Sequence, residues 1–393
     1  MNIFFIPSWY PTESNPNFGI FCREQISCYA NAFPDDNIFV SLWGQEDYFI
    51  SPADPSSWGK IFSRNEESRS VRNESNLFEL NTPVAHWSHR LGGLSQVTKA
   101  NQKNFLQTKV MGHKIDLIHA HVSFPGAYLA RKLSEQHGIP YLVTEHMSPF
   151  PFSHLEKHGK LIKELAWGLE KSSKIVCVSK HLEEEVNSYG LNETCVIPNF
   201  IDEDFFVIDS QNVNKSKKYF LTVGGMVPQK GIEDLVKVVS FVDGQIDPEI
   251  KFKIVGEGSE LENYKKLAEE MRVGHRIEFL GSKNREELLE LYQNCLAFIL
   301  TSQHESFGLV YLEAMACGRP VLATRCGGPE TFINEKNGLL FDVGDAPGIS
   351  RGLLTFLEKL EQYDPQVIRK TFSDKFSKEV VTKEVRSLYG SIC

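Results

Sequence analysis

The sequence predicts an α/β protein of two Rossmann-like domains, each built on a parallel sheet. Two observations carry this prediction. Short apolar runs alternate with longer amphipathic stretches along the chain, and a polar break near residues 199–218 separates two such series. With 393 residues, of which 41% are hydrophobic, the chain is long enough to bury two cores.

Ten apolar runs bounded by polar residues are predicted as strands. They are Ile3–Ile6, Ile38–Leu42, Leu117–Ala120, Tyr141–Thr144, Ile175–Val178, Tyr219–Val223, Phe252–Val255, Ile277–Leu280, Ala297–Leu300 and Pro320–Ala323. We divide the chain into domains at 1–198 and 199–375, followed by an amphipathic terminal helix within 376–393. Two sheets joined by one linker predict an interdomain cleft, which is the preferred place for a ligand. Residues 47–76, which show little periodicity, are predicted to form a surface excursion.

The composition excludes several classes of protein. A formal net charge of −9 argues against general nucleic-acid binding, which needs a basic surface. The eight cysteines include no C-x-x-C pair, so we interpret them as small buried hydrophobic residues of an intracellular protein. No run reaches the roughly 18 apolar residues of a membrane span. We therefore expect a cytoplasmic protein that is soluble or peripheral on the inner face of the plasma membrane.

The segment from Glu305 to Glu313 places two carboxylates eight residues apart around a predicted helix start. The helix is expected from Leu309 to Ala316, after a strand that ends near Leu300. Unpaired N–H groups at a helix start, together with the helix dipole, favour a diphosphate. Here those groups belong to Ser306, Phe307, Gly308 and Leu309.

This segment resembles the E-x7-E motif of the retaining glycosyltransferases of family 4 (glycosyl transferases group 1), which have the GT-B fold. Other motifs of that family stand in the family's order and spacing: Ile197–Asn199, Val223–Gly231, Ile254–Gly258, Ile277–Gly281 and Cys326–Glu330. The segment Ile6–Pro11, with Gly19 and Arg23–Gln25, is similar to the family's N-terminal glycine loop. The resemblance covers nearly the whole chain and is strongest from about residue 196 onward.

The resemblance implies two Rossmann-like domains facing a cleft, an acceptor domain at 1–198 and a nucleotide-sugar donor domain at 199–375, with the terminal helix returning to the N-terminal domain. It also implies a retaining, metal-independent hexosyltransferase without a cofactor. Such an enzyme moves a sugar from a nucleoside diphosphate sugar, such as a UDP-sugar, to a hydroxyl of a glycan or lipid-linked acceptor in polysaccharide or glycolipid synthesis. Two alternatives stay open: a catalytically impaired sugar-nucleotide binding protein, and a GT-B epimerase or phosphorylase.

The resemblance also suggests roles for single residues. Glu313 would bind the ribose diol, and Glu305 the transferred sugar and its developing charge. His146, at the end of a predicted strand, would contact the donor sugar. Lys230, which follows Gly224, would reach a phosphate, and Gly19 would let its loop approach the substrate. The family usually has arginine where this chain has Gly225; Arg325 is either a replacement for that cation or an ordinary rim residue.

Three further patterns have competing interpretations. His119 and His121 project to one face of a strand, but no third ligand is evident, so we expect no metal site. The D-x-D pattern of Asp202 and Asp204 is assigned to the linker. Trp9 and Tyr10 either stack on an acceptor sugar or pack under their loop.

The segment Trp87–Lys114 is anomalous because it contains no acidic residue in an acidic protein. Its cations are Arg90, Lys99, Lys103, Lys109 and Lys114, and its apolar residues include Trp87, Leu91, Leu94, Phe105 and Leu106. Such a helix either binds an anionic membrane surface or is merely solvated.

Overall fold

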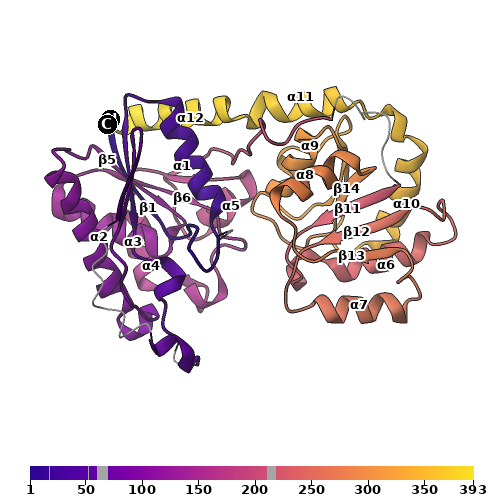
Figure 1. Cartoon of the computed structure of the whole chain (residues 1–393), viewed down its shortest axis with the longest axis horizontal. Helices are drawn as coiled ribbons and strands as arrows, with labels where there is room; N and C mark the ends of the chain where they lie inside the picture. The colour runs from indigo at the N-terminus through magenta and orange to yellow at the C-terminus, as the bar shows by residue number, and fades with distance from the viewer. Residues whose placement is uncertain (17, 52, 60–69, 210–217) are drawn as a thin grey trace. The chain divides into compact units, whose positions relative to one another are not determined.

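A computed structural model describes residues 1–16, 18–51, 53–59, 70–209 and 218–393. These residues form two compact units, which we describe separately (Figure 1). The N-terminal unit comprises Met1–Val178, Glu183–Ile197 and Thr382–Cys393. The C-terminal unit comprises Ser179–Leu182 and Pro198–Val381.

The N-terminal unit contains an eight-stranded sheet in which the strands, apart from the antiparallel edge strand β3, are parallel. In spatial order the strands are β10 (Thr194–Val196), β9 (Ile175–Cys177), β6 (Tyr141–Glu145), β5 (Leu117–His121), β1 (Asn2–Pro7), β2 (Asn37–Leu42), β4 (Leu77–Asn81) and β3 (Ser70–Glu74). A separate hairpin pairs β7 (Glu156–Lys157) with β8 (Lys160–Leu161). The central strand β1 is apolar and almost fully buried, as expected for a parallel strand covered on both faces.

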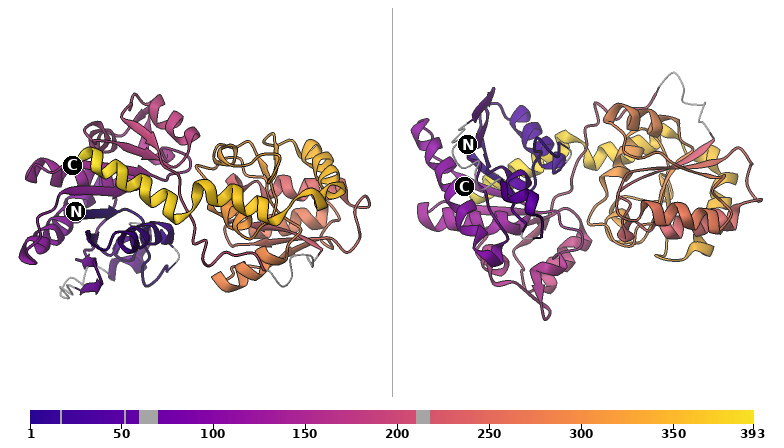
Figure 2. Two further views of the ribbon diagram at one scale, coloured as in Figure 1. Left: turned by 90° about the horizontal axis from the view of Figure 1, so that it is seen from above. Right: turned by 60° about the horizontal axis from the view of Figure 1, so that its bottom comes forward.

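Helices connect and flank this sheet (Figure 1). They are α1 (Ile20–Ala32), α2 (Gly93–Val110), α3 (Ser123–His137), α4 (Lys163–Glu170), α5 (Lys180–Ser188) and α12 (Lys378–Ile392), with 3-10 turns η1 (Gln45–Tyr48), η3 (His89–Leu91) and η4 (Ser153–Leu155). The first residues of α5 (180–182) and of α12 (378–381) belong to the C-terminal unit. The end of α12 packs on the N-terminal unit (Figure 2), where the hydroxyl of Tyr389 lies 2.6 Å from Nδ1 of His119 in β5. Arg386 pairs with the buried carboxylate of Asp36 nearby.

The C-terminal unit contains a parallel six-stranded sheet. Its order is β13 (Ile277–Phe279), β12 (Lys251–Val255), β11 (Tyr219–Val223), β14 (Ala297–Leu300), β15 (Val321–Thr324) and β16 (Gly338–Phe341). The helices are α6 (Ile232–Val242), α7 (Leu261–Glu270), α8 (Arg285–Asn294), α9 (Leu309–Ala316), α10 (Ala346–Glu358) and α11 (Pro365–Phe376), with 3-10 turns η5 (Pro228–Lys230), η6 (Gly328–Thr331) and η7 (Leu360–Gln362). The strand order reverses between β11 and β14, which makes their carboxyl ends the preferred ligand position of such a sheet.

Local sequence explains where several of these helices begin. Asn284 and Glu287 form a capping box at the start of α8. Asp345 and Asp364 cap α10 and α11, each followed by a proline in the first helical turn. Among the described residues, no helix combines the length and the apolar character needed to cross a bilayer.

The ten predicted strands are present, and the α/β fold class is confirmed. The prediction for residues 47–76 is wrong in part. Residues 60–69 and residue 52 lie outside the described residues, but β3 extends the sheet and Ser57 is buried. The error arises because the strand β3 pairs only at the sheet edge and carries no long apolar run.

Candidate functional site

The carboxyl ends of β11 and β14 bring an ammonium group and a carboxylate together. Lys230 follows β11 and Glu305 follows β14, and these strands are neighbours in the sheet. The Nζ atom of Lys230 lies 2.7 Å from Oε1 of Glu305. The side chain of Glu305 is only 6% exposed, whereas that of Lys230 is 27% exposed, so the cation is the more accessible partner.

Backbone contacts hold the two loops against each other. The amide of Gln303 donates to the carbonyl of Gln229 at 2.8 Å, and the hydroxyl of Thr301 donates to the carbonyl of Gly231 at 2.7 Å. A Cβ at Gly231 would lie 1.9 Å from the carbonyl oxygen of Thr301, and φ is +63° there. Glycine at position 231 is therefore required for the approach that places Lys230 beside Glu305.

Glu305 lies in the turn before α9, and Glu313 lies inside that helix. The hydroxyl of Ser302 also donates to Oε1 of Glu305, at 2.8 Å. Oε2 of Glu313 accepts a hydrogen bond from the hydroxyl of the buried Tyr292, at 2.7 Å. Each acid thus has a supporting hydroxyl, Ser302 or Tyr292, that the sequence pattern did not indicate.

The residues between the two acids differ in what they can present. Gly308 adopts φ +94°, and a Cβ there would lie 2.5 Å from the ring of Tyr311. The side chain of Phe307 is buried, with its ring 5.7 Å from that of Phe332, so only its backbone can serve a ligand. Ser306 is buried, and Leu309 is the first residue of α9.

The loop after β11 leaves room around Lys230. A Cβ at Gly224 would make ordinary contacts, at 3.6 Å, with the methylene chain of Lys230. A Cβ at Gly225 would have no neighbour closer than 3.9 Å. Arg325 follows β15 at the same sheet edge, where its side chain is 54% exposed and its Nε lies 3.7 Å from Asp342. The structure thus places Arg325 on the surface beside an acid.

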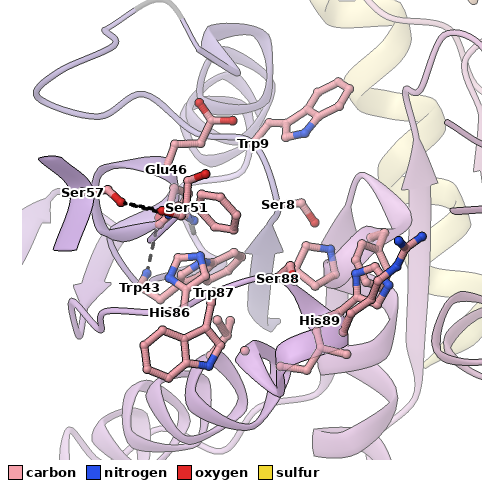
Figure 3. A pocket seen from close by; sticks show the side chains of 18 of the residues that line it. Ser8, Trp9, Trp43, Glu46, Ser51, Ser57, His86, Trp87, Ser88 and His89 are labelled. Carbon is pink, nitrogen blue, oxygen red and sulfur yellow. Dashed lines mark hydrogen bonds between the residues drawn. The ribbon is translucent and has the colours of Figure 1, made fainter. Parts of the chain in front are cut away.

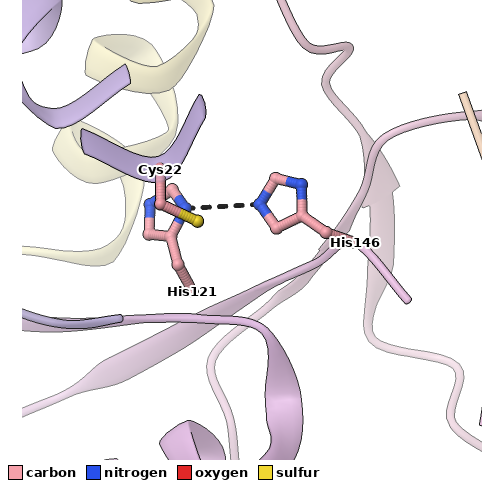
Figure 4. A group of neighbouring side chains, drawn as sticks. All are labelled: Cys22, His121 and His146. Atoms are coloured by element: carbon pink, nitrogen blue, oxygen red, sulfur yellow. Dashed lines mark hydrogen bonds between the residues drawn. The ribbon is translucent and has the colours of Figure 1, made fainter. Parts of the chain in front are cut away.

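In the N-terminal unit, His146 follows β6 and is buried next to His121 at the end of β5. Nδ1 of His121 lies 3.3 Å from Nε2 of His146 (Figure 4). Burial, followed by the effect of His121, holds the pKa of His146 well below its usual range. His146 is therefore a neutral imidazole in this fold.

Cys22 completes a buried group with these two histidines (Figure 4). One ligand atom from each of the three residues lies within 4.8 Å of the others. Burial raises the pKa of the Cys22 thiol and lowers that of His121 to about 3. Zinc binding would require this thiol to lose its proton, and the raised pKa opposes that loss. The cluster was missed because Cys22 comes from α1, far along the chain from both histidines.

His119 does not join this cluster as a ligand, although it shares a strand face with His121. Its Nδ1 lies 2.6 Å from the Tyr389 hydroxyl, and its Nε2 lies 2.7 Å from the hydroxyl of Thr144. Both ring nitrogens are therefore occupied. His119 has a structural role in holding the end of α12.

Gly19 is required for a structural reason that differs from the predicted one. Its φ is +65°, and a Cβ would lie 2.4 Å from the backbone carbon of Trp9. The loop after β1 thus packs directly on Gly19. The indole of Trp9 lies about 6 Å from the rings of Phe18 and Phe152, which confirms that it packs within its loop region, and it also lines a pocket. Stacking of Trp9 on an acceptor sugar stays a prediction.

The acids of the D-x-D pattern are bound by cations within the C-terminal unit. Asp202 lies 2.8 Å from Arg285 and also pairs with Lys378. Asp204 lies 3.0 Å from Lys378. These ion pairs give the two acids a structural role, because they connect the segment around residues 202–204 to α8 and α12.

Comparison with known proteins matches this chain to glycosyltransferases. The family model described as "Glycosyl transferases group 1" matches residues 203–369, and "Glycosyltransferase Family 4" matches residues 65–205. An uncharacterized glycosyltransferase of Methanocaldococcus jannaschii is 30% identical over 314 residues, which is 76% of this chain and 82% of that protein. A lipopolysaccharide core biosynthesis glycosyltransferase of Rhizobium meliloti is 29% identical over 224 residues, covering 55% and 64%.

A solved structure is similar over the whole chain. The Anabaena protein HepE in complex with UDP matches with a TM-score of 0.71 and 17% identity, covering 100% of both chains. At this identity the match supports the fold, with two Rossmann-like domains of the GT-B type.

Proposed function

Because the chain belongs to glycosyltransferase family 4, we propose that this glycosyltransferase is a retaining enzyme that uses a nucleoside diphosphate sugar, with UDP-sugars as the first candidates. The observation that carries the proposal is the pairing of Lys230 with Glu305 where the strand order reverses. The UDP bound to the similar HepE structure supports the choice of nucleotide.

In this proposal the diphosphate binds at Lys230 and the start of α9. The ammonium group and the N–H groups at the helix start offset the negative charge that grows on the leaving group. Glu313 accepts hydrogen bonds from the ribose diol, while Glu305 favours positive charge at the anomeric carbon. The acceptor hydroxyl attacks on the face from which the diphosphate departs, and a phosphate oxygen of the leaving group takes its proton. His146 binds the transferred sugar as a neutral imidazole.

We propose that the transfer needs no metal. Support comes from Asp202 and Asp204, whose carboxylates are engaged by Lys378 and Arg285. The Lys230 ammonium can take the charge role that a divalent cation has in other transferases. Dialysis against EDTA should leave the rate unchanged, and a loss that manganese restores would refute metal independence.

The alternative is a sugar-nucleotide binding protein that has lost turnover because it has glycine, and not arginine, at position 225. The space around Gly225 favours a direct test, since a Cβ atom there would meet nothing closer than 3.9 Å. Gly225→Arg should strengthen diphosphate binding and raise an already measurable turnover. A wild-type protein that binds a sugar nucleotide without turnover, and gains turnover only with Gly225→Arg, would favour the alternative.

The acceptor is proposed to be a glycan or lipid-linked glycan of polysaccharide or glycolipid synthesis. The relative named for lipopolysaccharide core biosynthesis supports this class. The exposed face of α2 supports docking on an anionic membrane, because Lys99, Lys103, Leu106 and Val110 recur there at helical spacing. Trp87 and Phe105, in contrast, do not belong to that face: Trp87 lines a pocket and Phe105 is buried.

The proposed function can be tested with a panel of nucleotide sugars. Thermal unfolding with UDP-, GDP-, ADP- and dTDP-sugars would first identify the base and the sugar. Slow hydrolysis or transfer of that donor would then be followed by NMR, with the anomeric configuration of the product as the readout. A product with inverted configuration, or the absence of a stabilising nucleotide sugar, would contradict the proposal.

A further inference from the structure

A pocket of about 810 Å³ lies within the N-terminal unit (Figure 3). Ser8 follows β1, Trp43 follows β2, His86 follows β4 and Phe124 follows β5, and all four line the pocket. The pocket is therefore at the carboxyl edge of the sheet, and its size falls in the range of about 300–1,000 Å³ typical of small-ligand sites.

Backbone and side-chain hydrogen bonds preform the pocket wall. The amide of Ile50 donates to the carbonyl of His86 at 2.7 Å, and the amide of His86 donates to the carbonyl of Tyr48 at 3.0 Å. The amide side chain of Gln45 donates to the carbonyl of Pro7 at 3.0 Å. These bonds tie the loops after β2 and β4 to each other and to the end of β1, so a ligand meets a wall that is already ordered.

Aromatic side chains from separate loops supply much of the lining. Trp9, Trp43, Phe49, Trp87 and Phe124 all contribute to it. Trp43 is 2% exposed, whereas Phe49 is 38% exposed. Flat apolar rings pack well against the C–H faces of a pyranose ring, and a few polar groups beside them can fix its hydroxyls.

The charged groups of the lining favour an uncharged ligand. The acidic groups of the lining are the carboxylates of Glu46 and Asp54, and its basic groups are the guanidinium of Arg90 and the imidazoles of His86, His89 and His154, so neither sign of charge dominates. Burial raises the pKa of Glu46, which further limits the negative charge. Burial lowers the pKa of His89, so this lining histidine adds no charge at neutral pH. Carboxylates accept hydrogen bonds from sugar hydroxyls but repel phosphate and carboxylate groups.

We propose that this pocket binds the acceptor through an uncharged sugar ring, packed on its aromatic side chains and hydrogen-bonded to Glu46. This inference rests on the proposed transfer activity and specifies the acceptor as a neutral glycosyl unit. A lipid carrier, where present, lies outside the pocket.

Saturation-transfer NMR with two kinds of probe tests the proposal. Methyl β-glucoside, methyl β-galactoside and methyl N-acetyl-β-glucosaminide are the neutral probes, and glucose 6-phosphate and methyl β-glucuronide are the charged ones. At least one neutral probe should bind at least tenfold more tightly than both charged ones. Phe49→Ala and Glu46→Gln should each weaken that binding at least fivefold, whereas Phe241→Ala, at an exposed phenylalanine outside the pocket, should not.

Octyl β-glucoside below its micelle concentration distinguishes a sugar site from a lipid site. Saturation of the ring protons supports the proposal, whereas saturation confined to the octyl chain would overturn it. Tighter binding of the charged sugars, or neutral binding unchanged in both pocket variants, would also overturn it. UDP binding measured on the same variants is a separate readout: if wild-type protein binds the neutral sugar but no sugar nucleotide, the proposed donor chemistry fails while the sugar pocket stands.

Discussion

Lys230 and Glu305 are 75 positions apart in the sequence, yet their charged atoms lie 2.7 Å apart at the carboxyl ends of two neighbouring strands. The Lys230 ammonium is the more exposed partner, and the Glu305 carboxylate is also bonded by Ser302. An incoming diphosphate can therefore approach the cation while Glu305 stays fixed. The two residues are proposed to have different partners, the diphosphate for Lys230 and the transferred sugar for Glu305, and the predictions below use that difference.

Glu305→Gln and His146→Ala are each expected to lower turnover strongly while leaving UDP affinity close to that of wild type. The reason is that both side chains are proposed to act on the sugar and its developing charge, which matter most in the transition state. Initial rates on the donor found active, together with UDP calorimetry, measure both quantities. Wild-type turnover in either variant would remove that residue from the catalytic site.

Membrane docking should depend on the cations of α2. Changing Lys99, Lys103 and Lys109 together to Glu should abolish sedimentation with anionic vesicles, because each cation near the surface contributes about 1 kcal/mol. Binding of wild-type protein to the vesicles should also fall with added salt, since screening limits the range of surface-charge interactions to about 8 Å at physiological ionic strength.

The matched control changes Lys266, Lys336 and Lys359 to Glu, three exposed lysines of the C-terminal unit. This variant has the same net charge as the α2 variant and should still bind vesicles. Wild-type protein that ignores anionic vesicles at low salt would refute docking and favour a soluble glycan acceptor.

Stability should fall on mild acidification because three buried histidines are neutral in the fold. The pKa values of His119, His121 and His146 are held below their usual value near 6.5, mainly by burial. The unfolded chain therefore binds more protons than the folded chain below about pH 6.5. As the pH falls from there to its folded pKa, each such histidine lowers the free energy of unfolding by up to about 1.4 kcal/mol per pH unit. Burial raises the pKa of Glu145, which acts in the opposite direction.

Urea unfolding at pH 7.5 and pH 5.5 checks this prediction. The variant His121→Gln should lose less stability between the two pH values than wild type does, which removes the contribution of Glu145 from the comparison. His158→Gln, at an exposed histidine, is the control and should behave as wild type. Equal pH dependence in wild type and His121→Gln would contradict the account.

Much of the fold could be predicted because parallel strands buried on both faces leave continuous apolar runs. β1 and β14 are examples, with nearly every residue buried. The edge strands were harder to predict from the sequence. β3 has a partner strand on one side only, and most residues of β16 are only partly buried, so neither strand shows a continuous buried apolar run. Pairing with a neighbour, and not the local sequence, defines such strands.

The candidate site was predictable where it follows the ends of strands. Lys230 and Glu305 could be placed on one sheet edge for that reason. The supporting residues could not, because contacts such as that of Tyr292 with Glu313 join separate helices and leave no spacing pattern. The aromatic pocket was missed for the same reason, since its wall includes Phe49 from a stretch without periodicity.

The central claim is that the loop carrying Lys230 holds a nucleoside diphosphate, and calorimetric titration of UDP into Lys230→Ala tests it most directly. Loss of one charge-assisted hydrogen bond is typically worth about 1.5–3 kcal/mol, so affinity should fall about tenfold to a hundredfold. Lys237→Ala, which removes a surface ammonium paired with Glu233 on α6, should bind UDP as wild type does. If UDP is not the nucleotide, the one selected by the thermal panel replaces it in both titrations. Unchanged affinity in a folded Lys230→Ala variant would contradict the placement of the diphosphate.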